Sequence, residues 1–287
     1  MNLQHTELGA GPTRKRRRPR LTLVTVSFVV IGIVVLLVLF GPLLAPQDPT
    51  AQDLADINAG PSTAHLLGTD VLGRDTFSRL IVGARSAFIG PLLIALGSMI
   101  IGNILGLVSG YRGGRVDAVI MRWVDFMWSV PTLLVLIVVA AAVGANYWLA
   151  VGLMVALTAP FDTRVIRGAT LEQVPRPYVE AAKVLGVSDR RIMVHHIWPN
   201  LSATALANAF LIFASSVGVL AALSFLGLGV APGTPDWGLM LAENESLLFS
   251  QPLAALAPGL MLALTATSMN LVGDWIYERM SNRGMSR

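Results

Sequence analysis

Long apolar runs dominate this sequence and decide its fold class. The first covers residues 21–44, and five more lie near Ala87–Ser109, Ala118–Gly144, Trp148–Val165, Leu201–Leu228 and Pro252–Tyr277. An α-helix needs roughly 20 apolar residues to cross a bilayer. Lipid leaves backbone polar groups unsatisfied unless a helix or a closed barrel pairs them, and no strand-like alternation is present. The sequence therefore predicts an all-α membrane protein with six transmembrane helices.

The composition agrees with this class and excludes several kinds of chemistry. The 287 residues are 54% hydrophobic and 13% charged, whereas soluble domains carry about 25% charged residues. With no cysteine, disulfides, thiolate chemistry and Cys-based metal sites are excluded. The four histidines form no spaced ligand cluster, and neither lysine, Lys15 or Lys183, belongs to a phosphate-binding loop. We therefore expect no cofactor on this chain.

The basic residues predict the orientation. Six lie in the tail 1–20, three in the first inner loop, six around the second and three near the C-terminus, leaving Arg74, Arg79 and Arg85 outside. Such an excess marks the cytoplasmic side, so both termini are predicted to be cytoplasmic. A basic run can also bind nucleic acid, but its place directly before an apolar run favours a membrane anchor. That run is too long for a signal-peptide core.

These features divide the chain into five parts. We expect a cytoplasmic tail at 1–20, a first transmembrane helix at 21–44 and an extracytoplasmic segment at 45–85. A five-helix core follows at 86–280 with a cytoplasmic loop at 166–200, and a short cytoplasmic tail ends the chain at 281–287.

The polar stretch Tyr178 to Pro199 in that loop predicts two short helices. Pro177 suits a first helical turn, Gly186 suits a helix stop, Ser188 suits an N-cap, and Pro199 is expected to end the second helix. Helical spacing places Tyr178, Ala182 and Leu185 on one face, which small alanines leave open to close approach by another backbone. From periodicity alone, a solvated loop without a partner remains the alternative.

The same stretch resembles the EAA loop of ABC-importer permeases. The matching residues are Glu180, Ala181, Ala182, Gly186 and Pro199, while His196 and Trp198 replace two residues of the general pattern. The motif ends in His, Ile, any residue and Pro, which is similar to its ending in the peptide and nickel branch of that family. The resemblance implies a coupling helix that docks on a cytosolic ATPase subunit. The implied contact residues are Tyr178, Glu180, Ala181, Ala182, Lys183, Leu185, Gly186 and Pro199.

Three further segments resemble the C-type permease of dipeptide and oligopeptide importers. They are Leu67 to Asp70 with Gly73 to Asp75 and Ser78-Arg79, then Tyr111 to Pro131, and Ser224 to Gly238. The resemblance implies a type I importer bundle in the bacterial inner membrane that carries peptides. It also implies a second homologous permease, two ATPase subunits that hold ATP and Mg, and an extracytoplasmic binding protein. No nucleic-acid partner is implied.

Several polar residues fall within the apolar spans. Asp125, Asp162 and Asp274 lie near predicted cytoplasmic ends, where pairing with Arg122, Arg164 or Arg279 is expected. Asn103 and Asn270 are expected to bond between helices. Trp237 suits the membrane interface. Gly90, Gly97, Gly102 and Gly106 suit close helix packing.

Alternatives to peptide import remain open at this stage. Similar permeases carry nickel or glutathione-like solutes, and no residue can be assigned to the solute. A stand-alone secondary transporter is less favoured, because no chain of acidic residues crosses the bilayer and no inverted repeat with broken helices is evident. A membrane enzyme is also less favoured, because the sequence places no Ser/His/Asp triad or set of metal ligands at a common membrane depth.

Overall fold

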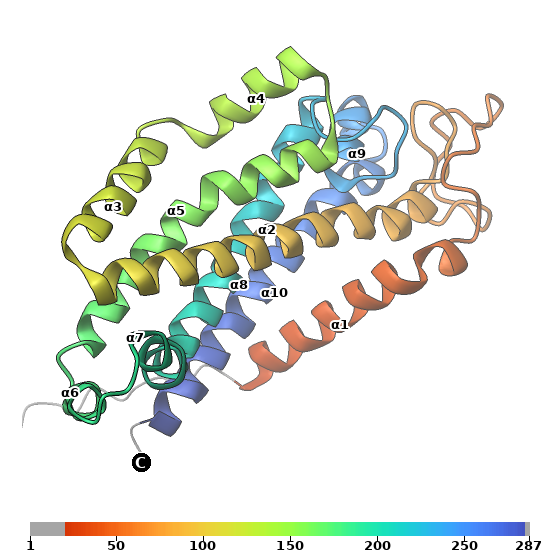
Figure 1. Ribbon diagram of the computed structural model, residues 1–287. Helices are drawn as coiled ribbons and strands as arrows, with labels where there is room; N and C mark the ends of the chain where they lie inside the picture. The colour runs from red at the N-terminus through yellow and green to blue at the C-terminus, as the bar shows by residue number, and fades with distance from the viewer. Residues whose placement is uncertain (1–20, 285–287) are drawn as a thin grey trace, which may run out of the picture.

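The computed structural model describes residues 21–284, and Figure 1 shows this part as an elongated helical bundle. The predicted basic tail at 1–20 lies outside the described residues, as do the last three residues. The elements are α1 (Leu21–Leu44), α2 (Thr76–Arg112), α3 (Gly114–Trp128), α4 (Thr132–Val143), α5 (Tyr147–Gln173), α6 (Pro177–Val184), α7 (Asp189–Arg191), the π-helix η1 (Ile192–Ile197), α8 (Trp198–Phe225), α9 (Trp237–Glu243), the 3₁₀-helix η2 (Glu245–Leu247) and α10 (Pro252–Gly284).

The predicted spans are all present, but the third is broken. Among the described residues, five helices are long and apolar enough to cross a membrane, and a sixth span results if α3 and α4 count as one. Those two helices bend by 73° at their junction. Pro131 is the N-cap of α4, and a proline there lacks the N–H that would continue the preceding helix. The break in the third span therefore lies at Pro131.

Helix α2 begins much earlier than its apolar run. It starts at Thr76 because the Asp75 side chain accepts a hydrogen bond from the Ser78 backbone N–H at 2.7 Å, which satisfies one free donor of the first turn. Helix α2 thus includes the last ten residues of the segment predicted to be extracytoplasmic at 45–85. Hydropathy marks only the part of a helix in lipid, whereas the cap sets where it starts.

A stripe of glycines holds α2 close to α5. A Cβ atom on Gly97 would lie 2.9 Å from Val155, one on Gly106 would lie 2.7 Å from the Thr163 carbonyl, and one on Gly102 would overlap Asp162. Only glycine permits this separation of the two helices. The predicted packing role of these glycines is confirmed.

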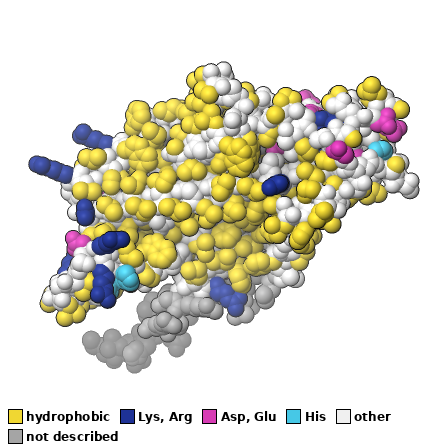
Figure 2. Space-filling view, turned by 45° about the vertical axis from the view of Figure 1, so that its right-hand side comes forward, with side chains coloured by type: hydrophobic (Ala, Val, Ile, Leu, Met, Phe, Trp, Pro, Cys, Tyr) yellow, Lys and Arg dark blue, Asp and Glu magenta, His cyan; other side chains and the backbone are white. Residues whose placement is uncertain are grey.

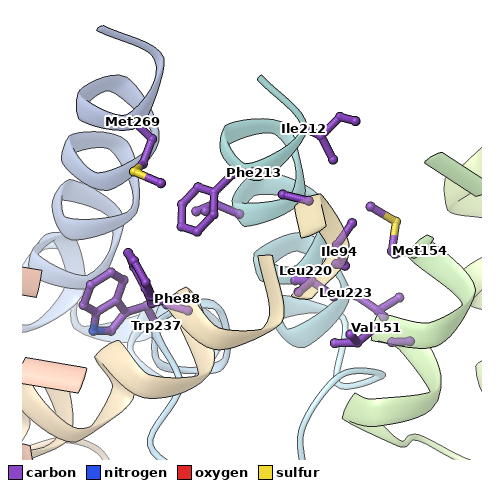
Figure 3. Close-up of a cluster of buried hydrophobic side chains, with 14 of the residues drawn as sticks. Phe88, Ile94, Val151, Met154, Ile212, Phe213, Leu220, Leu223, Trp237 and Met269 are labelled. Atoms are coloured by element: carbon purple, nitrogen blue, oxygen red, sulfur yellow. The ribbon is translucent and has the colours of Figure 1, made fainter. Parts of the chain in front are cut away.

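The main core gathers side chains from α2, α5, α8, α9 and α10 (Figure 3). Phe88 meets Phe213 edge-on with ring centroids 5.1 Å apart, and Trp237 lies beside them. Trp237 is fully buried and donates its indole N–H to the Leu80 carbonyl at 2.8 Å. The expectation that Trp237 anchors the membrane interface is wrong, because the loop before α9 folds inward and the ring fills the bundle.

Charge separates along the molecule. Figure 2 shows Lys and Arg gathered mainly at one end of the visible face and Asp and Glu mainly at the other, with a broad hydrophobic surface between them. The basic end carries α6 and α7, and the other end carries the segment between α1 and α2 (Figure 1). This distribution matches the orientation predicted from the sequence, and the two ends are named below as cytoplasmic and extracytoplasmic on that basis.

Candidate functional site

The cytoplasmic loop forms a helix–turn–helix, as predicted. Pro177 opens α6 at its first position, where its missing N–H is not needed. Gly186 follows the helix with φ +74°, a left-handed conformation that favours glycine. Ser188 takes the N-cap position of α7 but makes no side-chain cap bond. Asp189 instead accepts a hydrogen bond from the Tyr111 hydroxyl at 2.8 Å, which ties α7 to the end of α2.

Pro199 does not end the second helix. The chain passes from α7 through η1 into α8, and residues 189–225 qualify as one candidate span. Pro199 lies in the first turn of α8, directly after the π-helical segment. A proline removes one backbone donor, and a π-helical stretch shifts the hydrogen-bond pattern, so the helix bends here without a break in its backbone hydrogen bonding (Figure 1).

The predicted face of α6 is divided between the core and solvent. Val179 and Ala182 are buried in a second cluster with Ile192, Met193 and Ile197. The small side chain of Ala182 does allow a close backbone, but that backbone is η1 of the same chain. Ala182 therefore does not share an exposed face with Tyr178 and Leu185, since the two inward positions hold α6 on the chain's own core.

The remaining side chains of α6 form an exposed surface at the cytoplasmic end. We call it the α6 surface, and it consists of Tyr178, Glu180, Ala181, Lys183, Val184 and Leu185. Val184 and Leu185 are 87% and 80% exposed. Sequence reasoning missed Val184, although its position beside Leu185 could have indicated it. Two neighbouring apolar side chains in water are typical of a surface that a partner covers.

Local contacts hold two members of this surface in place. Tyr178 donates its hydroxyl to Gln173 Oε1 at 2.8 Å, and desolvation raises its pKa, which keeps the phenol neutral and able to donate. The Lys183 ammonium lies 5.3 Å from the centre of the Tyr111 ring, within range of a cation–π interaction.

At the extracytoplasmic end, the second motif builds a buried ion network. Asp70, Arg74 and Arg79 are each about 1% exposed. Arg74 donates to Asp70 at 2.6 Å and to Glu243 at 2.7 Å. Arg79 donates to Glu243 at 2.7 Å and to the Gly233 carbonyl at 3.0 Å. Two cations and two carboxylates thus join the segment before α2 to α9.

Glu243 was missing from the sequence prediction. It lies about 165 residues from its two partners along the chain, and no local pattern marks it. The motif's other acid, Asp75, caps α2 and lies 3.0 Å from His65 Nδ1. The segment before α2 is therefore a folded structural unit.

The acidic residues of the spans differ in their partners. Asp125 pairs with Arg164, as predicted. Asp162 is fully buried and accepts a hydrogen bond from the Asn208 amide on α8, while its Oδ2 has no partner among the described residues. The predicted arginine partner for Asp162 is wrong, because Arg164 points to α3. Asp117 pairs with Arg167, a contact that the sequence did not suggest.

The expected asparagine contacts are also different. Asn103 donates its amide to the Met99 carbonyl of its own helix at 2.6 Å, so its predicted bond between helices is wrong. Asn208 makes the interhelical bond instead. Within residues 21–284, no group of three or more His, Cys, Asp or Glu side chains could hold a metal ion.

Comparison with known proteins agrees with this architecture. The family described as "Binding-protein-dependent transport system inner membrane component" matches residues 102–284. The "N-terminal TM domain of oligopeptide transport permease C" matches residues 21–61. Together the two matches reach both ends of the described chain.

Individual relatives match over most of their length. The probable D,D-dipeptide transport system permease protein DdpC of Escherichia coli is 37% identical over 89% of this chain and 86% of its own. The oligopeptide permease OppC of Lactococcus lactis is 32% identical over 94% and 93%. The glutathione permease GsiD of Pectobacterium atrosepticum is 37% identical over 79% and 75%.

A solved structure supports the fold. The inward-facing MetNI methionine ABC transporter contains a chain that aligns with a TM-score of 0.57 at 17% identity, covering 70% of this chain and 96% of that one. At this identity the likeness speaks for the fold alone. With family matches over both parts of the chain and relatives above 30% identity, this protein belongs to the inner membrane components of binding-protein-dependent ABC transport systems, in the oligopeptide permease C branch.

Proposed function

We propose that this inner-membrane permease imports peptides, driven by cytosolic ATPase subunits that dock on the α6 surface. Family membership implies ATPase and binding-protein partners. Our proposal adds a second homologous permease and two ATPase subunits, so that each permease presents one docking loop. ATP-driven closure of the ATPases would then move the two loops and rock the two bundles.

The exposure of α6 is the observation that carries this proposal. The helix is fixed to the bundle through Val179 and Ala182, while Val184 and Leu185 stand in solvent beside Glu180 and Lys183. A helix that packs on the core with one face and exposes the other can transmit a movement of a bound partner to the core. Its inner contacts reach η1, which leads directly into α8.

The names of the relatives support a peptide as the solute. Two of them are described as dipeptide or oligopeptide permeases and one as a glutathione permease. Glutathione is itself a small peptide, so it remains a specific second candidate. Uptake of labelled dipeptide, oligopeptide and glutathione into cells with and without the chain distinguishes these solutes.

The docking role is tested by a pull-down of the tagged chain from its native membrane in mild detergent, with ATPase activity measured on the eluate. We expect Glu180→Arg, which reverses a charge on an exposed helix, to remove the ATPase subunits without changing insertion. Ala182→Pro should do the same by breaking α6, since proline in a helix interior costs about 3 kcal/mol.

Glu172→Arg is the matched control, because this residue is an exposed glutamate at the end of α5, outside the α6 surface. ATPase subunits that co-purify equally with the wild-type and Glu180→Arg chains would remove the α6 surface from the mechanism. A chain that purifies alone and moves solute without ATP would contradict the proposal altogether.

A further inference from the structure

Two adjoining hollows at the cytoplasmic end differ in character. One, of about 460 Å³, is lined by Ser188, Arg190, Arg191, Val194 and His195. The other, of about 320 Å³, is lined by Asn103, Ile104, Leu107, Val194 and Trp198. Val194 lines both, so the cationic hollow and the mainly apolar groove are neighbours on the surface.

The cationic hollow contains positive charges that are not paired within the described chain. Neither Arg190 nor Arg191 forms a salt bridge with another residue in the described part of the chain. Both residues are exposed, as is His195 beside them. Asp189, the nearest acid in sequence, accepts the Tyr111 hydroxyl instead. The hollow thus offers two guanidinium groups that form no salt bridge with an acidic side chain of residues 21–284.

The apolar groove lies along the last third of α2. Helix α2 has 37 residues, a length of about 55 Å at 1.5 Å per residue, whereas the hydrocarbon core is only about 30 Å thick. Ile104 lies two turns before the helix ends at Arg112. It is 58% exposed and continues a stripe of exposed apolar side chains that includes Leu93, Leu96 and Ile100.

The two hollows lie where α7 crosses the cytoplasmic end of the bundle. In Figure 1, α6 and α7 are seen nearly end-on while α2, α5, α8 and α10 run across the view, so the loop helices lie crosswise to the bundle. Trp198, 42% exposed, lies in the groove at this turn, and tryptophan favours the headgroup level of a bilayer.

We propose that these hollows bind one anionic phospholipid of the cytoplasmic leaflet. Its phosphate would lie between Arg190 and Arg191, and an acyl chain would follow the groove past Val194 along Ile104 and Leu107. Arginine suits this contact because its planar guanidinium donates two parallel hydrogen bonds to phosphate oxygens. Basic pockets between helices on the cytoplasmic side are known to hold anionic headgroups. The inference does not depend on which solute is carried.

The occupied site would connect the bilayer to the docking loop. Arg190 and Arg191 belong to α7, which continues directly into η1, and η1 also supports α6 through Val179 and Ala182. A lipid bound here would stabilise the position of the α6 surface relative to the membrane. We therefore expect ATPase coupling to depend on anionic lipid.

The test uses the complex purified in mild detergent and titrated with phosphatidylglycerol or phosphatidylcholine of identical acyl chains, with bound lipid counted by native mass spectrometry. We expect phosphatidylglycerol to bind more tightly. The double variant Arg190→Gln/Arg191→Gln should weaken it by about 10- to 30-fold, the effect of removing two basic side chains at the membrane surface. Binding of phosphatidylcholine should stay unchanged.

The matched control is Arg112→Gln/Arg115→Gln. It removes the same charge from exposed positions at the same end of the bundle but outside the hollows, and should change binding less than about twofold. A second readout is the quenching of tryptophan fluorescence by brominated lipids. If the acyl chain lies in the groove, the extra quenching by brominated phosphatidylglycerol over brominated phosphatidylcholine should mostly disappear in Trp198→Phe.

Several results would overturn the proposal. Equal affinity for the two lipids, or equal loss in both double variants, would show a diffuse basic surface rather than a site. Displacement of phosphatidylglycerol by inorganic phosphate would show a simple anion site without an acyl groove. Loss of the ATPase subunits in Arg190→Gln/Arg191→Gln with lipid affinity retained would assign the arginines to that protein partner.

Discussion

The two ends of this bundle use charged motifs in opposite ways. At the extracytoplasmic end, Asp70, Arg74 and Arg79 are buried and paired with one another and with Glu243. At the cytoplasmic end, Glu180 and Lys183 are exposed beside bare apolar side chains. The first motif therefore completes the fold, whereas the second leaves a surface that, on our proposal, a partner covers.

This contrast predicts that equivalent substitutions act on different properties. Changes in the buried network should unfold the protein. Changes on the α6 surface should leave the fold intact and weaken assembly.

Arg79→Met should give the largest effect. It removes a buried cation whose guanidinium is bonded to Glu243 and Gly233, leaving Glu243 with one partner and Asp70 with less compensation. Breaking a buried ion pair in this way costs about 3–5 kcal/mol. We expect a large fall in melting temperature, measured by size-exclusion chromatography of heated samples. Arg85→Met, at an exposed position of the same helix, should change stability by less than about 0.5 kcal/mol.

If the two arginine variants melt at the same temperature, the buried network does not hold the extracytoplasmic end together. The contrast between the two ends would then be one of exposure only, without an energetic difference.

Leu185→Asp should come next and act on assembly. A leucine side chain transferred from water to a protein interface contributes about 1.5–3 kcal/mol, so ATPase binding should weaken at least about tenfold while the melting temperature stays the same. Binding of the purified ATPase subunits to the permease in nanodiscs measures this. Leu54→Asp is the control, because Leu54 is a comparably exposed leucine at the opposite end.

Normal ATPase binding by Leu185→Asp, or an equal loss in Leu54→Asp, would show that exposed leucines on this molecule do not report a docking surface.

Asn208→Leu tests a polar pair that lies between these extremes, inside the membrane. It removes the one described hydrogen bond to the buried Asp162 carboxyl group, and interhelical bonds in membranes average roughly 0.6 kcal/mol with a maximum near 1.7. A double-mutant cycle with Asp162→Leu isolates the pair. A coupling energy indistinguishable from zero would mean that the two groups are neighbours without mutual stabilisation.

The sequence alone was sufficient for the membrane class, the positions of the apolar spans and the helical turn around Gly186. Each of these depends on local properties: runs of apolar residues, the spacing of Pro177 and Gly186, and the excess of arginine on one side. Helix starts were predicted less well, because Asp75 extends α2 beyond its apolar run through a cap that hydropathy does not register.

What a side chain faces was decided by the tertiary structure. Ala182 and Leu185 were expected on one face, yet η1 covers the first and leaves the second in water. Glu243 joined the ion network from a distant helix, and Asn208 replaced arginine as the partner of Asp162. Such contacts depend on how helices far apart in the chain pack together, and a helical period specifies a face but not its neighbour.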